Sequence, residues 1–288
     1  MKDIIASLRP GQWIKNLFVF AAPVFGRVLF RPGPAVRTAA VFALFCVLAG
    51  ALYLVNDILD AESDRFHPRK AKRPIAAGRL RPGTAWAAAA GLAACALAAS
   101  AALDRRVFLA LAAYALLQLS YSLVLKRVVI LDVFLVASGF VIRVAAGGFA
   151  AGVVPSSWLL VCTSLLALLI AVGKRRNELL TLEECGEAHR SVLRDYTPAL
   201  LDQMIAVVTA ATMVTYALYA MSEDTSRRFG SGRLLWTAPF VLYGIFRYLF
   251  LVYRKGQGGT PEEMIIEDLP FLAAIALWAA VSAGIVYF

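Results

Sequence analysis

The sequence is poor in the residues that most hydrolytic, redox and zinc-dependent proteins use. It contains 2 histidines and 4 cysteines in 288 residues. The cysteines form no CxxC pair and have no histidine at a spacing that suits zinc, so neither a disulfide framework nor a zinc site is indicated. Histidine-based catalysis is equally unexpected. Charged residues make up only 17% of the chain, against roughly 25% in an ordinary soluble domain.

Apolar residues are correspondingly abundant, at 60% of the chain, where about 45–50% is usual. This composition excludes a disordered chain, a nucleic-acid reader and a small secreted disulfide scaffold. A membrane-spanning helix needs about 20 mostly apolar residues. The stretches that approach this length are residues 14–31, 36–55, 84–103, 107–125, 128–150, 156–173, 204–222, 234–252 and 270–287. The sequence therefore predicts an all-α polytopic membrane protein, a bundle of about nine transmembrane helices in a single domain, 1–288.

The distribution of Lys and Arg predicts the orientation of this bundle. With the N-terminus in the cytoplasm, 19 Lys and Arg lie in cytoplasmic segments and 8 on the opposite side. Because cytoplasmic loops are enriched in positive residues, we expect a multi-pass protein of the inner (plasma) membrane with polar loops 56–83 and 174–203 in the cytoplasm. The N-terminal segment lacks the apolar core and cleavage site of a signal peptide, so we expect insertion to begin at the first spanning helix.

An acidic cluster follows the second predicted helix, in the segment YLVNDILDAESDRFHPRKAKRPIAAG. At 3.6 residues per turn, Asp57, Asp60 and Asp64 share one helix face. Carboxylates crowded near hydrocarbon are costly, and a divalent cation removes that cost. Mg²⁺ takes one or two protein carboxylates and completes its shell with water and substrate phosphates. The pattern therefore predicts a Mg²⁺ site, and the alternative is a solvated acidic helix end.

Basic residues follow the acidic cluster and can pair with phosphate oxygens. They are Arg65, Arg69, Lys70, Lys72 and Arg73. The alternative is that they serve only to set topology, as Lys and Arg in cytoplasmic loops commonly do.

Three further groups of polar residues border or interrupt the apolar stretches. Lys174 and Glu178 in GKRRNELLTLEE stand four residues apart and can pair along a helix. Tyr121 and Lys126 in YSLVLKRVVILD end the fourth stretch. Arg143 lies inside the fifth stretch, where a charged residue indicates a functional site. The alternatives are a topogenic KRR run and a structural pair between Arg143 and Asp132, with nearby glycines allowing close helix packing.

These residues carry a family resemblance. NDxxDxxxD followed by DRxHPxKxxRPIAxG resembles the first signature of the UbiA superfamily of intramembrane prenyltransferases, and the number of helices is similar as well. Members that use a prenyl diphosphate carry a second motif of DxxxD type in loop 6–7, where this chain has GKRRNELLTLEE instead. That segment, the opening RPGQWIKNLFVFAAPVF and YSLVLK resemble one branch, the decaprenyl-phosphate phosphoribosyltransferases.

The resemblance implies an enzyme that transfers 5-phosphoribose from phosphoribosyl diphosphate (PRPP) to a polyprenyl monophosphate, towards an arabinosyl donor for the cell envelope. It gives Asp57, Asp60 and Asp64 the role of holding Mg²⁺. The catalytic residues expected are Asp57, Asp60, Lys126 and Lys174. The substrate-binding residues expected are Lys15, Asn56, Arg65, Lys70, Arg73, Tyr121, Lys126, Arg143, Lys174, Arg175 and Glu178.

The chemistry of these substrates agrees with the composition. A phosphate acceptor is already ionised near neutral pH, so no general base is required, and extra cations in place of a second acidic motif suit the additional anionic groups. The expected partners are PRPP, a polyprenyl phosphate and the membrane, without nucleic acid, and a homo-oligomer is compatible with the sequence. The alternatives are a UbiA-type prenyltransferase acting on an aromatic or lipid acceptor and, in another class, a transporter or channel.

Overall fold

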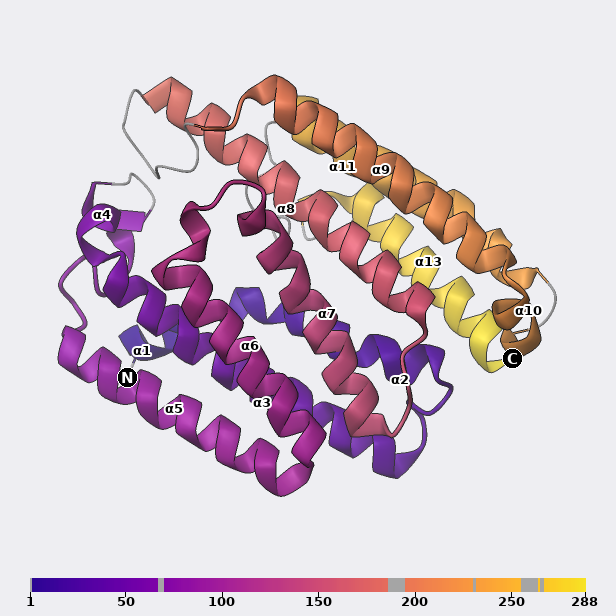
Figure 1. Ribbon diagram of the computed structural model, residues 1–288, viewed down its shortest axis with the longest axis horizontal. Coiled ribbons are helices and arrows are strands. Elements are labelled where there is room, and N and C mark those ends of the chain that lie inside the picture. Colours follow the sequence, from indigo (N-terminus) through magenta and orange to yellow (C-terminus); the bar gives the residue numbers. More distant parts are fainter. Residues whose placement is uncertain (1, 67–69, 186–194, 230–231, 255–263, 265–266) are drawn as a thin grey trace. The chain divides into compact units, whose positions relative to one another are not determined.

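The computed structural model describes the chain except for residues 1, 67–69, 186–194, 230–231, 255–263 and 265–266, and Figure 1 shows its ribbon. The described residues form helices and no strands. The helices long and apolar enough to cross a membrane are α3 (Pro32–Leu59), α5 (Pro82–Leu103), α6 (Arg105–Leu123), α7 (Leu131–Ala151), α8 (Ser157–Cys185), α9 (Pro198–Met221), α11 (Ala238–Arg254, extended at its start by η5, Arg233–Thr237) and α13 (Leu269–Tyr287). The predicted all-α polytopic architecture is confirmed.

The first predicted stretch, residues 14–31, is not a single α-helix. The 3₁₀ helix η1 (Pro10–Phe20) is followed by the short α2 (Ala21–Phe25). Pro23 has no N–H and its ring disfavours a continuous α-helix at this point. Because a 3₁₀ helix rises about 2.0 Å per residue, η1 and α2 together reach at most about 30 Å, the thickness of a hydrocarbon core. The count of nine is therefore approximate, with eight long helices in the described residues and one composite segment.

The starts of several spanning helices follow from local sequence. Proline stands within the first two positions of α3, α5, α9 and α13, where its missing N–H has no partner to lose. Asp104 caps α6, and its carboxylate accepts from the backbone N–H of Arg106 at 2.7 Å. Thr197 and Asp268 cap α9 and α13 in the same manner.

The chain divides into two compact units. The first comprises Met1–Lys126 and Gly139–Pro155, and the second comprises Arg127–Ser138 and Ser156–Phe288, so that α7 contributes to both. Whether the chain functions as the predicted single domain stays a prediction.

In the first unit, α5 and α6 pack against α3 (Figure 1). Buried apolar side chains of α3, α6 and the second half of α7 form the core, with Phe45 and Leu111 among the largest. Gly147 of α7 permits η1 to approach, because a Cβ atom there would lie 1.8 Å from the carbonyl oxygen of Val19. The close packing that the sequence suggested for the glycines near Arg143 is confirmed at this position.

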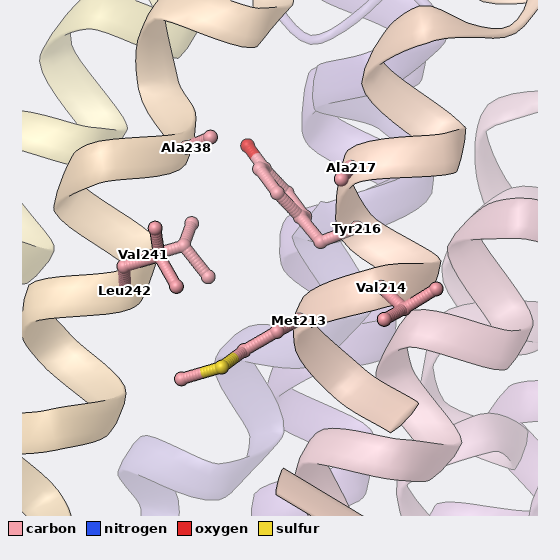
Figure 2. A pocket seen from close by; sticks show the side chains of 7 residues that line it. All are labelled: Met213, Val214, Tyr216, Ala217, Ala238, Val241 and Leu242. Carbon is pink, nitrogen blue, oxygen red and sulfur yellow. The ribbon is translucent and has the colours of Figure 1, made fainter. Parts of the chain in front are cut away.

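In the second unit, α9 packs against α8 and α11, and α11 packs against α13. Gly173 of α8 lies against Tyr248 of α11, whose hydroxyl would be 2.1 Å from an added Cβ atom. A cavity of about 220 Å³ lies between α9 and α11. Figure 2 shows the side chains that line it: Met213, Val214, Tyr216, Ala217, Ala238, Val241 and Leu242. The Tyr216 hydroxyl is already bonded to Thr237 and Trp278, so this cavity is a gap in apolar packing and carries no polar site.

Candidate active site

The acidic cluster lies where α3 ends and the short α4 (Ala61–Arg65) begins. The helix is interrupted at Asp60, whose backbone dihedrals (φ −96°, ψ 5°) are not helical. The backbone N–H of Asp64 still donates to the Asp60 carbonyl, four residues earlier, at 2.8 Å. Asp57 and Asp64 both contact Arg73, whereas Asp60 pairs with Lys126. No group of three or more Asp, Glu, His or Cys side chains placed to share a metal ion occurs in the described part of the chain.

Two of the carboxylates remain together because one arginine joins them. Arg73 Nη1 lies 3.1 Å from Asp57 Oδ1 and 2.5 Å from Asp64 Oδ2. Asp57 and Asp64 are 2% and 3% exposed, and a buried carboxylate needs a positive partner. The side chain of Arg73 is itself 23% exposed, so the pair of carboxylates is covered by a cation that a ligand can reach.

Arg9 is a second cation on Asp57, and it was not among the residues predicted for the site. Its guanidinium forms an ion pair with Asp57 Oδ1 and lies over the ring of Tyr53, with 4.8 Å between the guanidinium carbon and the ring centroid. Arg9 stands between α1 (Lys2–Ser7) and η1 in a left-handed conformation (φ 52°, ψ 66°). The opening RPGQW was noticed only as part of a resemblance.

The third carboxylate has a different partner. Lys126 Nζ lies 2.7 Å from Asp60 Oδ1, and Ser122 Oγ donates to Asn56 Oδ1 at 3.3 Å. Ser122 and Lys126 belong to the end of α6 and to η3 (Leu125–Arg127), and Tyr121 precedes them in α6 with a half-buried side chain. The structure therefore brings the YSLVLK segment to the end of α3, which sequence spacing could not show.

Further basic residues predicted to bind substrate are Arg65, Lys70 and Lys15. Arg65 is exposed in the last turn of α4, and Lys70 is half-buried in η2 (Lys70–Lys72). Arg69 lies outside the described residues. Lys15 Nζ donates to Gln12 Oε1 at 2.6 Å within η1.

Arg143 is 4% exposed in the interior of the first unit. Its guanidinium donates to Asn16 Oδ1, to the Tyr114 hydroxyl and to the Gly139 carbonyl, all at 2.8–2.9 Å. The alternative of a structural pair with Asp132 is wrong, because Asp132 is bonded to Arg175 and Tyr196 instead. Arg143 is thus held by neutral acceptors and by the face of the Tyr114 ring, 4.6 Å away.

The second unit contains a charged network in the second half of α8, which continues to Cys185. The first part of the expected polar loop 174–203 is therefore helical. Arg175 Nε lies 2.8 Å from Asp132 Oδ2, and Arg175 also pairs with Glu178. Asp132 is completely buried and Arg175 is 4% exposed. The neighbouring Lys174 is exposed. Two adjacent cations that look alike in the sequence therefore differ in access to solvent.

Tyr196 completes this network, and sequence reasoning missed it. Its hydroxyl donates to Asp132 Oδ1 at 2.8 Å and accepts from the backbone N–H of Ile130 at 2.7 Å. Burial and the hydrogen bond to Asp132 raise the pKa of Tyr196 to about 12. Tyr196 lies in a polar loop with no motif around it, so no sequence signal could have indicated the contact.

The donor set at Asp57 and Asp64 suits a divalent cation. Two buried carboxylates draw positive charge from Arg9 and Arg73, and Mg²⁺ characteristically uses one or two carboxylates together with phosphate oxygens of a substrate. The arrangement of carboxylates and reachable cations is one that can bind a metal–diphosphate group. It has no histidine, cysteine or serine placed as a nucleophile among the residues described above.

Comparison with known proteins gives a consistent result. Residues 18–264 match the model of the UbiA prenyltransferase family. The chain is 37% identical over 280 residues to a protein of Corynebacterium glutamicum named decaprenyl-phosphate phosphoribosyltransferase, covering 96% of this chain and 84% of that one. A protein of the same name from Mycolicibacterium smegmatis is 35% identical over 299 residues, with 100% and 93% coverage.

A solved structure supports the fold. The structure of a UbiA homologue from Archaeoglobus fulgidus bound to GPP and Mg²⁺ superposes with a TM-score of 0.73 and covers 99% of this chain and 100% of that one. Its sequence identity is 19%, so this likeness concerns the fold alone.

Proposed function

The chain belongs to the UbiA prenyltransferase family, and we propose that it transfers 5-phosphoribose from PRPP to a polyprenyl monophosphate and releases diphosphate. The observation that carries this proposal is the near full-length similarity to proteins named decaprenyl-phosphate phosphoribosyltransferase. The chain is a transferase, so the alternative of a transporter or channel is set aside. Decaprenyl phosphate is the acceptor that the names of the relatives suggest.

The donor is assigned to the cluster at the end of α3. Asp57 and Asp64 would hold Mg²⁺, which when bound supplies positive charge that stabilises a departing diphosphate. Arg73 forms ion pairs with both of these carboxylates, and Lys126 forms an ion pair with Asp60. We assign to them charge-assisted hydrogen bonds to diphosphate oxygens, with Asp60 and Asn56 positioning the end of α6.

The acceptor phosphate is assigned to Lys174, which is exposed in the second half of α8. Arg175 supports this site indirectly, because its ion pairs with Asp132 and Glu178 hold the turn of α8 that carries Lys174. A phosphate oxygen of the lipid attacks the anomeric carbon of the ribose, the new C–O bond forms, and the bond to diphosphate breaks. The expected stereochemical result is inversion, and no protein base has to remove a proton.

The other predicted residues keep supporting roles in the proposal. Arg65, Lys70, Tyr121 and Lys15 are assigned to the anionic groups of the substrates, and Arg143 to the interior of the first unit. The site is placed at the cytoplasmic face of the plasma membrane, as the distribution of Lys and Arg indicates. The product is assigned to the supply of a lipid-linked arabinosyl donor for the cell envelope.

Incubation of the purified protein with labelled PRPP, Mg²⁺ and decaprenyl phosphate tests the proposal. A labelled lipid in the organic extract is expected, and its formation should require the divalent cation. A parallel reaction with a polyprenyl diphosphate and 4-hydroxybenzoate should give no prenylated aromatic product, because the segment 174–203 has no second DxxxD motif. Efficient aromatic prenylation without phosphoribosyl transfer would favour the alternative, an ordinary UbiA-type prenyltransferase.

A further inference from the structure

Asp57 has an unusual set of partners for a carboxylate assigned to a metal. Its side chain is 2% exposed, and both Arg9 and Arg73 contact the same oxygen, Oδ1. Arg9 comes from a segment 48 residues earlier in the chain. A divalent cation bound at that oxygen would meet two guanidinium groups in the space it needs.

The backbone at Arg9 indicates that its position is imposed by the surrounding structure. A left-handed conformation (φ 52°) is uncommon for a residue with a side chain and is disfavoured by contacts of Cβ with the backbone. Such conformations persist where the surrounding structure holds them, and they cluster at functional sites. Here Leu8, beside Arg9, packs against Gly50 of α3, where an added Cβ atom would lie 2.9 Å from Leu8 Cδ2. The ring of Tyr53, one turn before Asp57, supports the guanidinium.

Access distinguishes Arg9 from a purely structural ion pair. Its side chain is 25% exposed although its partner is almost fully buried. The guanidinium can therefore leave Asp57 for an anionic group without crossing the apolar core. A planar guanidinium also binds phosphate oxygens as readily as carboxylates.

We propose that Arg9 is an internal counter-ion of Asp57 that a divalent cation must displace, and that the released guanidinium then binds an oxygen of the donor's diphosphate. The donor part of this inference rests on the proposed function, whereas the counter-ion part does not. The consequence is coupling: the cation binds weakly by itself and more tightly when a diphosphate is present to receive Arg9. Metal and donor would then enter the site together.

Binding of Mn²⁺, followed by its electron paramagnetic resonance signal, tests the inference without turnover. In the intact chain, inorganic diphosphate should tighten Mn²⁺ binding. Arg9→Gln should bind Mn²⁺ about tenfold more tightly in the absence of diphosphate, because the competing charge is gone. The same variant should lose most of the tightening that diphosphate produces, and its KM for PRPP should rise.

One further variant is a control, and another is a second test of Arg9. Arg79→Gln removes an arginine from an exposed ion pair with Asp3 of α1 and should leave Mn²⁺ binding unchanged. Arg9→Gly relieves the left-handed backbone and also removes the guanidinium, so it should reproduce the Arg9→Gln result even if the glutamine variant is poorly folded.

Two results would overturn the inference. One is Mn²⁺ binding that Arg9→Gln and Arg9→Gly leave unchanged. The other is an Arg79→Gln variant that, without diphosphate, binds Mn²⁺ as much more tightly as Arg9→Gln does, which would indicate a general effect of net charge. Because these measurements use Mn²⁺ and inorganic diphosphate, they decide the role of Arg9 whether or not a labelled lipid forms. Failure of the proposed function would appear only in the transfer assay.

Discussion

The two units each contain a buried aspartate bonded to arginine, and they use it differently. In the first unit, Asp57 is covered by Arg9 and Arg73, whose side chains are 25% and 23% exposed. In the second unit, Asp132 is covered by Arg175, whose side chain is only 5% exposed. A reachable cation can exchange its carboxylate for a substrate anion, whereas a buried one cannot do so without losing its pairing in a medium of low dielectric constant.

This difference in exposure suits the first ion pair to binding an anion and the second to stabilising the fold. The carboxylates at the end of α3 are paired with arginines that solvent can reach. The network of Asp132, Arg175 and Tyr196 instead joins the start of α7, the second half of α8 and the residues before α9. Lys174, beside Arg175, is exposed to solvent. The following substitutions test this assignment.

The largest effect is expected at the carboxylates of the first unit. Asp57→Asn should lower the rate of phosphoribosyl transfer by about 100-fold or more, because it removes negative charge from the proposed metal site. Asp60→Asn should have a similar effect, because it releases Lys126, which is assigned to the diphosphate. The assay is formation of labelled lipid over a range of Mg²⁺ concentrations. Asp3→Asn, in an exposed ion pair, is the matched control. Near-normal activity of Asp57→Asn at low Mg²⁺ would contradict the assignment of the metal site to this motif.

Breaking the buried pair of the second unit should act on stability. Arg175→Gln should lower the free energy of unfolding by about 3–5 kcal/mol, because Asp132 is left as an unpaired buried charge. Thermal unfolding in detergent measures this, and the double variant with Asp132→Asn should recover part of the loss. Lys174→Gln should leave stability unchanged. If Arg175→Gln instead raised the KM of a substrate at unchanged stability, Arg175 would belong to the binding site.

Removal of a reachable cation should weaken substrate binding. Lys126→Ala is expected to raise the KM for PRPP, and Lys174→Ala the KM for the lipid phosphate, each by about 1–3 kcal/mol in free energy. Steady-state kinetics with each substrate varied in turn separates the two effects. Arg227→Ala, from an exposed pair with Glu223, controls for loss of charge. Unchanged kinetics in both lysine variants would indicate that these residues only set topology.

The smallest effect concerns the hydroxyl of Tyr196. Its pKa is raised from an ordinary value near 10 to about 12. As the pH rises, the unfolded chain therefore loses the hydroxyl proton of Tyr196 before the folded protein does. The stability linked to this proton is present below about pH 10 and is lost as the pH rises from about 10 to 12. Tyr196→Phe should cost about 1 kcal/mol at neutral pH. Thermal unfolding measured against pH should show a shallower alkaline decline in the variant, and parallel curves would contradict the assignment.

Much of the architecture could be read from the chain. Long apolar stretches bounded by Pro and polar clusters predicted eight of the spanning helices, because a backbone in hydrocarbon must satisfy its own hydrogen bonds. The stretch 14–31 was predicted less well, since average apolarity does not distinguish one α-helix from a 3₁₀ helix followed by a short α-helix that ends at Phe25. The membership of the family was visible in the NDxxDxxxD signature.

The candidate site was only partly predictable. Asp57, Asp60 and Lys126 were selected from motif and charge, but their pairing was not, because it depends on where α6 ends relative to α3. Arg9 and Tyr196 had no signal of their own, since neither belongs to an acidic or basic cluster. The division of the three carboxylates between two cations was not predictable either, because Asp57 and Asp64 share Arg73 while Asp60 pairs with Lys126.

The sequence by itself determined the class of protein, the helices and the types of residue at the site, because apolar length, helix-starting prolines and clustered carboxylates act locally. Only the tertiary structure decided which charges meet. Arg9 reaches Asp57 across 48 residues, and Arg175 is buried on Asp132 while Lys174, one residue earlier, stays exposed. The physical reason is that the strength and accessibility of an ion pair depend on burial, and burial is a property of packed helices that no single segment contains.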